Sequence, residues 1–248
     1  MSFRRTLARL RYRAKHEIGR WPSLYHGLFR YRDGYGDRLV TDDTDLCIEG
    51  FPRSANSFAV GAIEYAQDDP LRIAHHNHVP APILRAAARG IPTIVLIRDP
   101  VEAVISFRGL QLQISARSNT PSSLPAISCR LHLQAWIAFY ERIRPVLGRV
   151  VVAPFKVVTS NFDRVIYALN DRFGTTFAPF DHTKENVDSV RDTRGHHALP
   201  SEQREALKKQ ARETFAAEIG EDHPLVERAT MLHQNYLEEA EPIRLGGR

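Results

Sequence analysis

Residues 47–58 have the sequence CIEGFPRSANSF, and this stretch decides the fold. It predicts an apolar strand over residues 46–51, then a turn of Pro, Arg and small polar residues, and then a helix from about Ser57. Such a turn gathers backbone N–H groups at a helix N-terminus, where the helix dipole favours an anion. The stretch therefore predicts a phosphate-binding turn. It differs from the common phosphate-binding loop, because GxxxxGK[ST] is absent and the cation, Arg53, stands at the start of the turn.

The rest of the chain alternates predicted strands and helices. The predicted strands are residues 46–51, 71–76, 93–98 and 149–154, and the predicted helices are residues 57–67, 79–89, 100–113, 126–147, 161–173, 201–219 and 223–240. This alternation predicts a three-layer α/β/α fold with a central parallel sheet. Ligands of such sheets bind at the carboxyl ends of the strands. The turn at residues 52–57 and the residues after His76 and Arg98 all follow strand ends, so we expect them to meet at one edge.

Composition is ordinary for a globular chain of 248 residues, with 43% hydrophobic and 25% charged residues. We expect a basic arm over residues 1–44 and one α/β domain over residues 45–248. The sequence contains no apolar run of about 18 residues, so we expect no transmembrane helix. Two cysteines, Cys47 and Cys129, cannot build a disulfide framework, which favours a reducing cytoplasm. The net charge of +5 fits an anionic ligand, an anionic membrane surface or nucleic acid.

The basic excess is concentrated in the first 32 residues, which carry nine Arg and Lys residues against one acid, Glu17. Leu7, Leu10, Ala14 and Ile18 recur at helical spacing, so we expect a basic amphipathic helix. Two interpretations stay open. The helix packs its apolar stripe on the main domain, or it offers a surface for anionic lipid, acidic glycan or a partner chain.

Two further motifs carry candidate chemistry. Residues 98–106, RDPVEAVIS, place Arg98 at a strand end and Ser106 in the next helix. The planar guanidinium suits phosphate, although a surface pair of Arg98 with Asp99 is the alternative. Residues 73–80, IAHHNHVP, would put His76 and His78 on the same side of an extended segment, where one of them could act as a general base. A metal site is the alternative there, but zinc takes at least three protein ligands and no third motif is evident.

Together these motifs resemble the sulfotransferases that use 3′-phosphoadenosine 5′-phosphosulfate (PAPS). Residues 52–58, PRSANSF, resemble the family's 5′-phosphosulfate loop, P-[KR]-S-G-T-T-W. Residues 98–106 resemble its 3′-phosphate motif, with the same Arg-to-Ser offset, and residues 76–80 resemble the segment K-x-H-[LV]-P that bears the catalytic base. Residues 150–158 are similar to a strand ending in Y-E-D-[LM], and Arg194 and Gly195 are similar to a late R-K-G segment.

The chain departs from these family patterns at several positions. Ala55 replaces Gly, so we expect a negative φ there. Phe58 replaces Trp and can still stack on adenine. His76 replaces Lys, and Phe155 replaces Tyr.

The resemblance implies a P-loop-NTPase-like sulfotransferase fold and in-line sulfuryl transfer without a metal. It implies catalytic roles for His78 as the base, Arg53 as the cation on the developing charge and His76 as a stabiliser of the transferring group. The donor-binding residues that it implies are Arg53, Ser54, Ala55, Asn56, Ser57, Phe58, Arg98, Ser106, Phe155, Arg194 and Gly195. We expect the acceptor to be a carbohydrate or another hydroxylated metabolite, because Arg53 replaces Lys, and we expect loops at residues 115–125 and 181–199 to select it.

Two other classes of protein stay open. One is a nucleotide-dependent kinase or another phosphotransferase. The sequence argues against this class, because it lacks the GK[ST] motif and a clear acidic motif that would hold a metal. The other is a non-catalytic protein that binds anions through the basic arm. We expect no nucleic-acid partner and a cytoplasmic location, with peripheral contact to an anionic membrane through the arm. The sequence indicates no oligomeric state.

Overall fold

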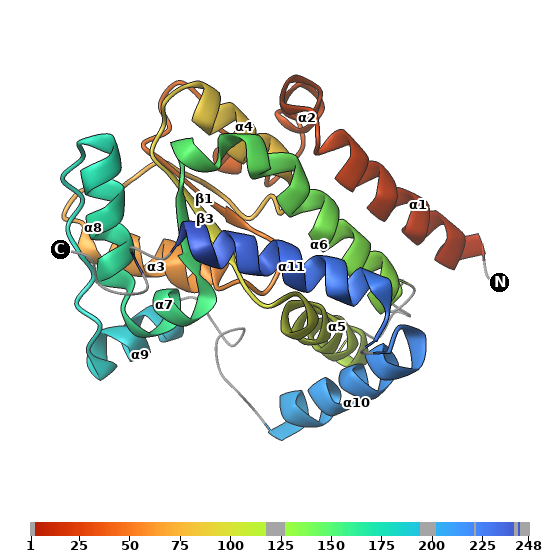
Figure 1. Cartoon of the computed structure of the whole chain (residues 1–248). Helices are drawn as coiled ribbons and strands as arrows, with labels where there is room; N and C mark the ends of the chain where they lie inside the picture. Colours follow the sequence, from red (N-terminus) through yellow and green to blue (C-terminus); the bar gives the residue numbers. More distant parts are fainter. Residues whose placement is uncertain (1–2, 118–126, 194–201, 221, 241–242, 244–248) are drawn as a thin grey trace.

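The computed structural model describes residues 3–117, 127–193, 202–220, 222–240 and 243 (Figure 1). Four parallel strands form one sheet in the order β2-β1-β3-β4. Their bounds are Leu46–Gly50 for β1, Ile73–His75 for β2, Thr93–Ile97 for β3 and Val151–Pro154 for β4. Apolar side chains line both faces of the sheet, which explains the near-continuous apolar runs in the strands. The predicted α/β class with a central parallel sheet is confirmed.

Helices cover both faces of this sheet and make three layers (Figure 1). Strand β3 shows the division, because Ile94 and Leu96 contact one apolar cluster while Val95 and Ile97 contact the other. One face is covered by α3 (Asn56–Ala66), α8 (Phe162–Phe173) and α9 (Lys184–Thr193). The other carries α4 (Pro80–Ala88), α5 (Pro100–Arg117), α6 (Cys129–Ile143) and α11 (Pro224–Glu239), with α10 (Glu202–Glu218) packed on α5.

The N-terminal arm forms α1 (Phe3–Ile18), α2 (Pro22–Phe29) and a 3-10 turn (Gly36–Arg38), and it packs against the main body. The Tyr12 hydroxyl lies 2.9 Å from His132 Nδ1 on α6, and the Ala81 amide on α4 donates to the Gly19 carbonyl oxygen at 2.8 Å. On α2, the Tyr25 hydroxyl donates to Asn77 Oδ1 at 3.2 Å. The arm is therefore hydrogen-bonded to the segment that carries the candidate histidines.

Several element boundaries differ from the sequence prediction. Helix α5 runs on to Arg117, and α6 ends at Ile143 because Pro145 has no N–H for a further helical bond, so the 3-10 turn Arg144–Arg149 follows. Helix α9 occupies residues that were expected to form a loop, and its Val187 and Val190 pack on the core. The short helix α7 (Phe155–Ser160) was also not predicted. No helix among the described residues is long and apolar enough to cross a membrane.

Candidate active site

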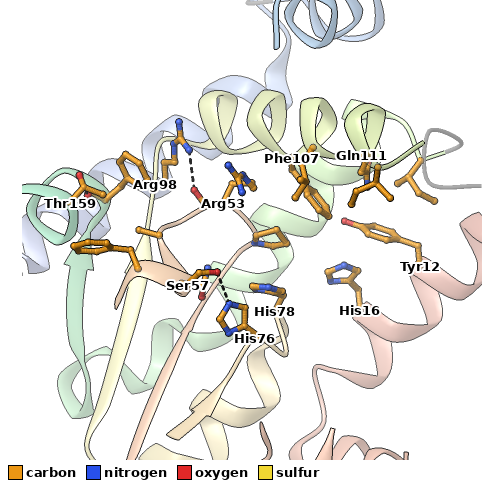
Figure 2. A pocket seen from close by; sticks show the side chains of 18 of the residues that line it. Tyr12, His16, Arg53, Ser57, His76, His78, Arg98, Phe107, Gln111 and Thr159 are labelled. Carbon is orange, nitrogen blue, oxygen red and sulfur yellow. Dashed lines mark hydrogen bonds between the residues drawn. The ribbon is translucent and has the colours of Figure 1, made fainter. Parts of the chain in front are cut away.

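The three sequence motifs lie together at the carboxyl ends of β1, β2 and β3. The register pairs Ile48 with His75 and Gly50 with Leu96, so the segments that follow these strands start side by side. They line a cavity of about 660 Å³, shown in Figure 2. From the motifs, the cavity walls include Arg53, Ala55, Asn56, Ser57, Phe58, His76, His78 and Arg98, together with Phe155 after β4.

The turn between β1 and α3 has an unusual backbone. Arg53 and Ala55 both have a φ of 72°, in the left-handed region that favours glycine. The expectation of a negative φ at Ala55 is therefore wrong, because Ala55 is the residue that caps α3 and the chain reverses there to enter the helix. Asn56 Nδ2 donates to the Phe51 carbonyl oxygen at 3.2 Å and closes the turn, while Ser54 is fully buried beneath it. Ala55, Asn56 and Ser57 line the cavity, so the N-terminus of α3 lies at its wall, where free amides can bind an anion.

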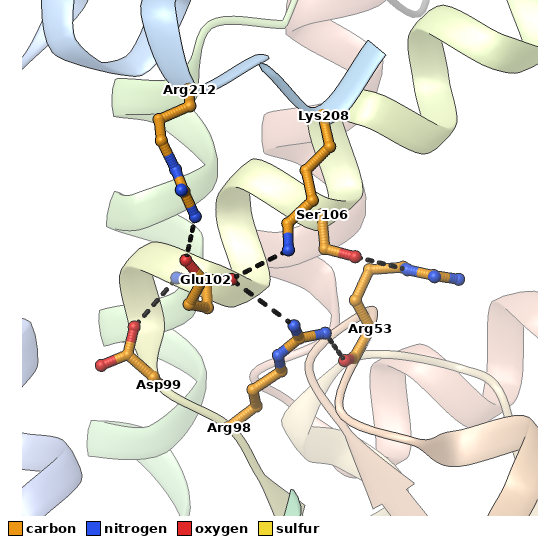
Figure 3. Close-up of polar contacts among 7 residues, drawn as sticks. All are labelled: Arg53, Arg98, Asp99, Glu102, Ser106, Lys208 and Arg212. Atoms are coloured by element: carbon orange, nitrogen blue, oxygen red, sulfur yellow. Dashed lines mark hydrogen bonds and ion pairs between the residues drawn. The ribbon is translucent and has the colours of Figure 1, made fainter. Parts of the chain in front are cut away.

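Arg53 and Arg98 are held by a polar network at the start of α5 (Figure 3). Arg98 Nη1 donates to the Arg53 carbonyl oxygen at 3.0 Å, and Arg53 Nε donates to Ser106 Oγ at 3.0 Å. Ser106 thus contacts the Arg53 side chain, although the sequence had grouped it with Arg98. The network fixes both guanidinium groups at the rim of the phosphate-binding turn.

The ion-pair partner of Arg98 is Glu102, at 3.8 Å, rather than the Asp99 of the alternative interpretation. Asp99 instead accepts the Glu102 amide at 2.9 Å. Glu102 also pairs with Lys208 at 3.5 Å and Arg212 at 2.5 Å on α10. The other face of Arg98 lies over the Phe155 ring, with Cζ 4.3 Å from its centre. Burial lowers the pKa of Arg98, and Glu102 and Asp99 oppose that shift.

The segment after β2 is folded over a buried carboxylate. Glu49 Oε1 accepts the Asn77 amide at 2.6 Å, and Oε2 accepts the His78 amide at 3.1 Å. His76 and His78 each have a φ of 57°, so this segment is not extended as predicted. The two rings nevertheless lie close, with centres 5.6 Å apart, and both line the cavity. Burial outweighs the hydrogen bonds to Glu49 and raises the pKa of its carboxyl to about 7.

Sequence reasoning missed Glu49, although one signal was present. It is the single acid within the apolar strand Leu46–Gly50. A buried carboxyl in such a strand needs hydrogen-bond partners, and here the His76–His78 segment supplies them.

The hydrogen bonds define the protonation of the candidate base. His78 Nδ1 lies 2.8 Å from the Gly50 carbonyl oxygen, which can only accept, so Nδ1 carries the proton and Nε2 keeps its lone pair. Burial lowers the pKa of His78 to about 3, so the ring is neutral near pH 7. His76 Nε2 lies 3.0 Å from Ser57 Oγ, and its Nδ1 lies 2.6 Å from His75 Nδ1. Burial lowers the pKa of His76 to about 4.

One end of the cavity is aromatic and basic. Phe58 packs edge-on against Phe162 and Phe180, with ring centres 6.3 and 5.9 Å apart, and its remaining surface lines the cavity. Thr159 and Arg191 line the same cavity, as does Phe155. Arg194 and Gly195, which the sequence grouped with this end, lie outside the described residues.

The opposite end of the cavity is formed by residues that the sequence analysis did not select. They are Tyr12, Lys15 and His16 from α1, Phe107, Leu110, Gln111 and Ile114 from α5, and Ile127. Figure 2 shows Tyr12 and His16 on the far side of His76 and His78 from Arg98 and Thr159. The amphipathic pattern of α1 predicted an apolar face, but no sequence signal places that face on this cavity.

The charge of the cavity has one sign. Among the described residues, its walls carry four cations, which are Lys15, Arg53, Arg98 and Arg191, and no carboxylate. Such a site attracts anions. Within the described part of the chain, no group of three or more His, Cys, Asp or Glu residues is arranged to hold a metal ion. The expectation that the site works without a metal stays a prediction.

No protein-family model matches the sequence, and no curated protein matches it. Among solved structures, the chain is similar to a mouse sulfotransferase, SULT7A1, in a crystal structure complexed with PAP. The identity is 10% and the TM-score is 0.42, and the similarity covers 85% of this chain and 95% of that chain. At this identity no side-chain role is transferred from that protein.

Proposed function

We propose that the chain is a sulfotransferase that moves a sulfuryl group from PAPS to an acceptor hydroxyl. One observation carries the proposal. A single cavity is lined by the turn after β1, by His76 and His78 after β2, and by Arg98 after β3. These are the segments whose sequences resemble the donor-binding and catalytic motifs of that family.

The aromatic and basic end of the cavity fits the donor. The amides at the start of α3, with Ser57, Asn56 and Arg53, would hold the 5′-phosphosulfate. Arg98 would bind the 3′-phosphate. Ser106 would contribute indirectly, because its hydroxyl accepts a hydrogen bond from the Arg53 side chain and holds that side chain in place. Phe58 and Phe155 offer ring surfaces for adenine. The guanidinium groups of the cavity wall, which carries no carboxylate among the described residues, suit a ligand with several negative charges.

The proposed reaction is an in-line displacement at sulfur. The acceptor oxygen forms a bond to sulfur while the bond between sulfur and the bridging phosphate oxygen breaks, and the leaving nucleotide takes that electron pair. His78 Nε2 takes the acceptor proton, because its lone pair is free once Nδ1 donates to Gly50. Arg53 would stabilise the charge that develops on the bridging oxygen.

We propose a narrower role for His76 than the resemblance implied. Its pKa is lowered to about 4, so in the free protein it is neutral near pH 7 and carries no charge to place on the sulfuryl group. We expect it to orient Ser57 through the 3.0 Å hydrogen bond.

Two expectations about cellular context remain proposals. A cytoplasmic location is supported by Cys47 and Cys129, which are both buried and unpaired. Peripheral membrane contact is supported by the exposed cations on the arm, such as Arg11 and Arg13. Vesicles of anionic phospholipid should bind the chain more than neutral vesicles do. Equal binding to both kinds of vesicle would remove the membrane proposal.

Thermal denaturation with different nucleotides tests the donor site. A ligand at about 100 times its Kd adds about 2.7 kcal/mol, which for a chain of this size raises Tm by roughly 5–11 °C. We expect this rise with adenosine 3′,5′-bisphosphate without magnesium. AMP should give a smaller rise, because it lacks the 3′-phosphate.

The variant Arg98→Ala makes the test specific. It should remove most of the difference between the bisphosphate and AMP, whereas Arg89→Ala, at an exposed position outside the cavity, should keep it. A rise with ATP and magnesium alone would contradict the proposal and favour a kinase. No rise with any nucleotide would favour a non-catalytic anion-binding protein.

A further inference from the structure

The end of the first cavity that lies opposite the proposed donor end, formed by α1 and α5, is here called the acceptor end, and a second cavity adjoins it. It measures about 540 Å³ and lies along α1, and Tyr12, Lys15 and Ile127 line both cavities. The second cavity therefore begins where the acceptor end of the first one stops. A sufficiently long molecule that presents a hydroxyl to His78 would reach the second cavity past Tyr12 and Lys15.

The walls of the two cavities differ in chemical character. Next to the histidines they are mainly apolar and aromatic, and Phe107, Leu110 and Ile114 from α5 line the first cavity together with Tyr12 from α1. Figure 2 shows Phe107 and Tyr12 side by side at this end. Such walls suit an apolar body and offer a sugar few polar partners, in contrast to the carbohydrate that the sequence led us to expect. The acceptor body is therefore expected to be apolar.

The far cavity is basic. Its walls include Arg11, Lys15 and Arg32 and no carboxylate among the described residues. Two of these cations lie near one aromatic ring of the same cavity, with Arg32 Cζ 5.1 Å and Lys15 Nζ 5.7 Å from the centre of the Tyr35 ring. None of the three cations takes part in an ion pair between described residues. The positive charge here is thus open to a ligand.

Helix α1, which contributes Tyr12 and Lys15 to both cavities, is fixed in place. The Tyr12 hydroxyl and Gln111 Oε1 lie 2.9 and 3.1 Å from the two ring nitrogens of the fully buried His132. Tyr12 also packs edge-on against His132, with ring centres 5.1 Å apart. This contact ties α1 to α5 and α6, so the boundary that the two cavities share belongs to the folded body.

We propose that the acceptor is an amphipathic anion, in which an apolar body carries the reacting hydroxyl at one end and an anionic group at the other. The hydroxyl meets His78, the apolar body lies along Phe107, Leu110 and Ile114, and the anion binds Arg11, Lys15 and Arg32. This assignment rests on the proposed sulfotransferase function and narrows its substrate class.

Acceptor series that differ only at the far end test the proposal. The probes are ω-hydroxy fatty acids of several lengths, primary alcohols of the same lengths, and the matching ω-amino alcohols. Turnover is followed by nucleotide release from PAPS, and equilibrium binding is measured by calorimetry on the chain saturated with adenosine 3′,5′-bisphosphate. We expect the hydroxy acids to have the lowest KM and Kd and the amino alcohols the highest.

Variants on the arm locate the anion. The double variant Arg11→Gln/Arg32→Gln should raise KM and Kd for the hydroxy acid roughly 10- to 100-fold, or about 1.4–2.7 kcal/mol, and abolish the preference for acid over alcohol. The matched control is Arg13→Gln, an exposed cation of α1 that lines neither cavity. It should keep the preference, which separates a local contact from the general charge of the arm.

Two results would overturn the proposal. One is equal KM and Kd for acid and alcohol at every chain length in the unaltered chain. The other is a preference for the acid that survives the double variant. Failure of the sulfotransferase function looks different, because the bisphosphate would then give no rise in Tm. Calorimetry of the chain alone with the hydroxy acid would still report on the basic cavity in that case.

Discussion

His78 has its Nδ1 proton bound to the Gly50 carbonyl oxygen and its backbone in a left-handed conformation. Asparagine tolerates that conformation, and its amide can donate to the same carbonyl. His78→Asn should therefore preserve the fold while removing the lone pair of Nε2. We expect kcat to fall by roughly 10²- to 10⁴-fold, because a general base contributes about that much. The affinity for adenosine 3′,5′-bisphosphate, measured by calorimetry, should stay the same.

His75→Asn is the matched control for this variant, since His75 precedes the same turn without lining the cavity. It should lower kcat much less than His78→Asn does. Full kcat in His78→Asn would assign the proton transfer to another group.

Ala55 shows how a single residue stores strain at the phosphate-binding turn. An L-residue with a φ of 72° costs roughly 1–2 kcal/mol, which glycine avoids. Ala55→Gly should therefore raise the free energy of unfolding by up to about 1 kcal/mol, since glycine also gains entropy in the unfolded chain. Ala59→Gly, one turn into α3, should lower it by about 1 kcal/mol or more. Urea denaturation measures both, and a loss of stability in Ala55→Gly would show that the turn is relaxed.

Residues at the strand ends show what sequence alone can predict about the site. The turn after β1 and the position of Arg98 follow from local patterns, because apolar runs and helix starts fix where strands end. The left-handed conformations of His76 and Ala55 do not, because they depend on contacts across the fold. The conformation of the His76–His78 segment depends on Glu49, which accepts hydrogen bonds from the amides of Asn77 and His78. Glu49 lies about 28 residues before them in the chain.

At the scale of elements, the strands and most helices were predicted to within a few residues, whereas the position of α1 was not. Its amphipathic pattern shows that one face is buried but does not say against what. The answer depends on long-range contacts, such as that of Tyr12 with His132. The acceptor end of the cavity was missed for the same reason, since α1 supplies one of its walls.

The junction of α1 with the body depends on Gly19. A Cβ atom there would lie 2.5 Å from Val79 Cβ, and Val79 is buried next to His78. Gly19→Ala should therefore lower stability by about 1–3 kcal/mol, the cost of overpacking, and Tm by roughly 2–12 °C. It should also reduce kcat, because Val79 would move together with the His76–His78 segment.

Gly27→Ala is the matched control for this junction. A Cβ at Gly27, in α2, meets nothing within 4 Å, so alanine should raise stability by about 0.5–1 kcal/mol through helix propensity. Scanning calorimetry and turnover of both variants test the junction. A Gly19→Ala chain as stable and active as the unaltered one would show that α1 moves freely against α4.

At the scale of the whole molecule, buried histidines should control the response to acid. Burial lowers the pKa to about 3 for His16, His78 and His132 and to about 4 for His75 and His76. In the unfolded chain a histidine has a pKa near 6.5. Between these values the unfolded state binds more protons, so these groups stabilise the fold fully above pH ~6.5, and that stability is lost as pH falls.

Glu49 acts in the opposite direction. Its pKa rises from 4.5 to about 7 on folding, so its contribution is present at low pH and is lost as pH rises through 7. Because five histidines oppose one carboxyl, the histidines dominate the change of folding stability with pH between pH ~4 and ~6.5. We therefore predict that Tm falls steadily when the pH is lowered from about 7 to about 5.

The variant His132→Gln tests this origin of the acid response. Glutamine can hydrogen-bond to Tyr12 and Gln111 but binds no proton, so the plot of Tm against pH should become shallower by the contribution of one group. Tyr12→Phe removes the same hydrogen bond and keeps the imidazole, so it should lower Tm without flattening the plot. A Tm that does not change with pH in the unaltered chain would mean that these rings are hydrated in solution rather than buried.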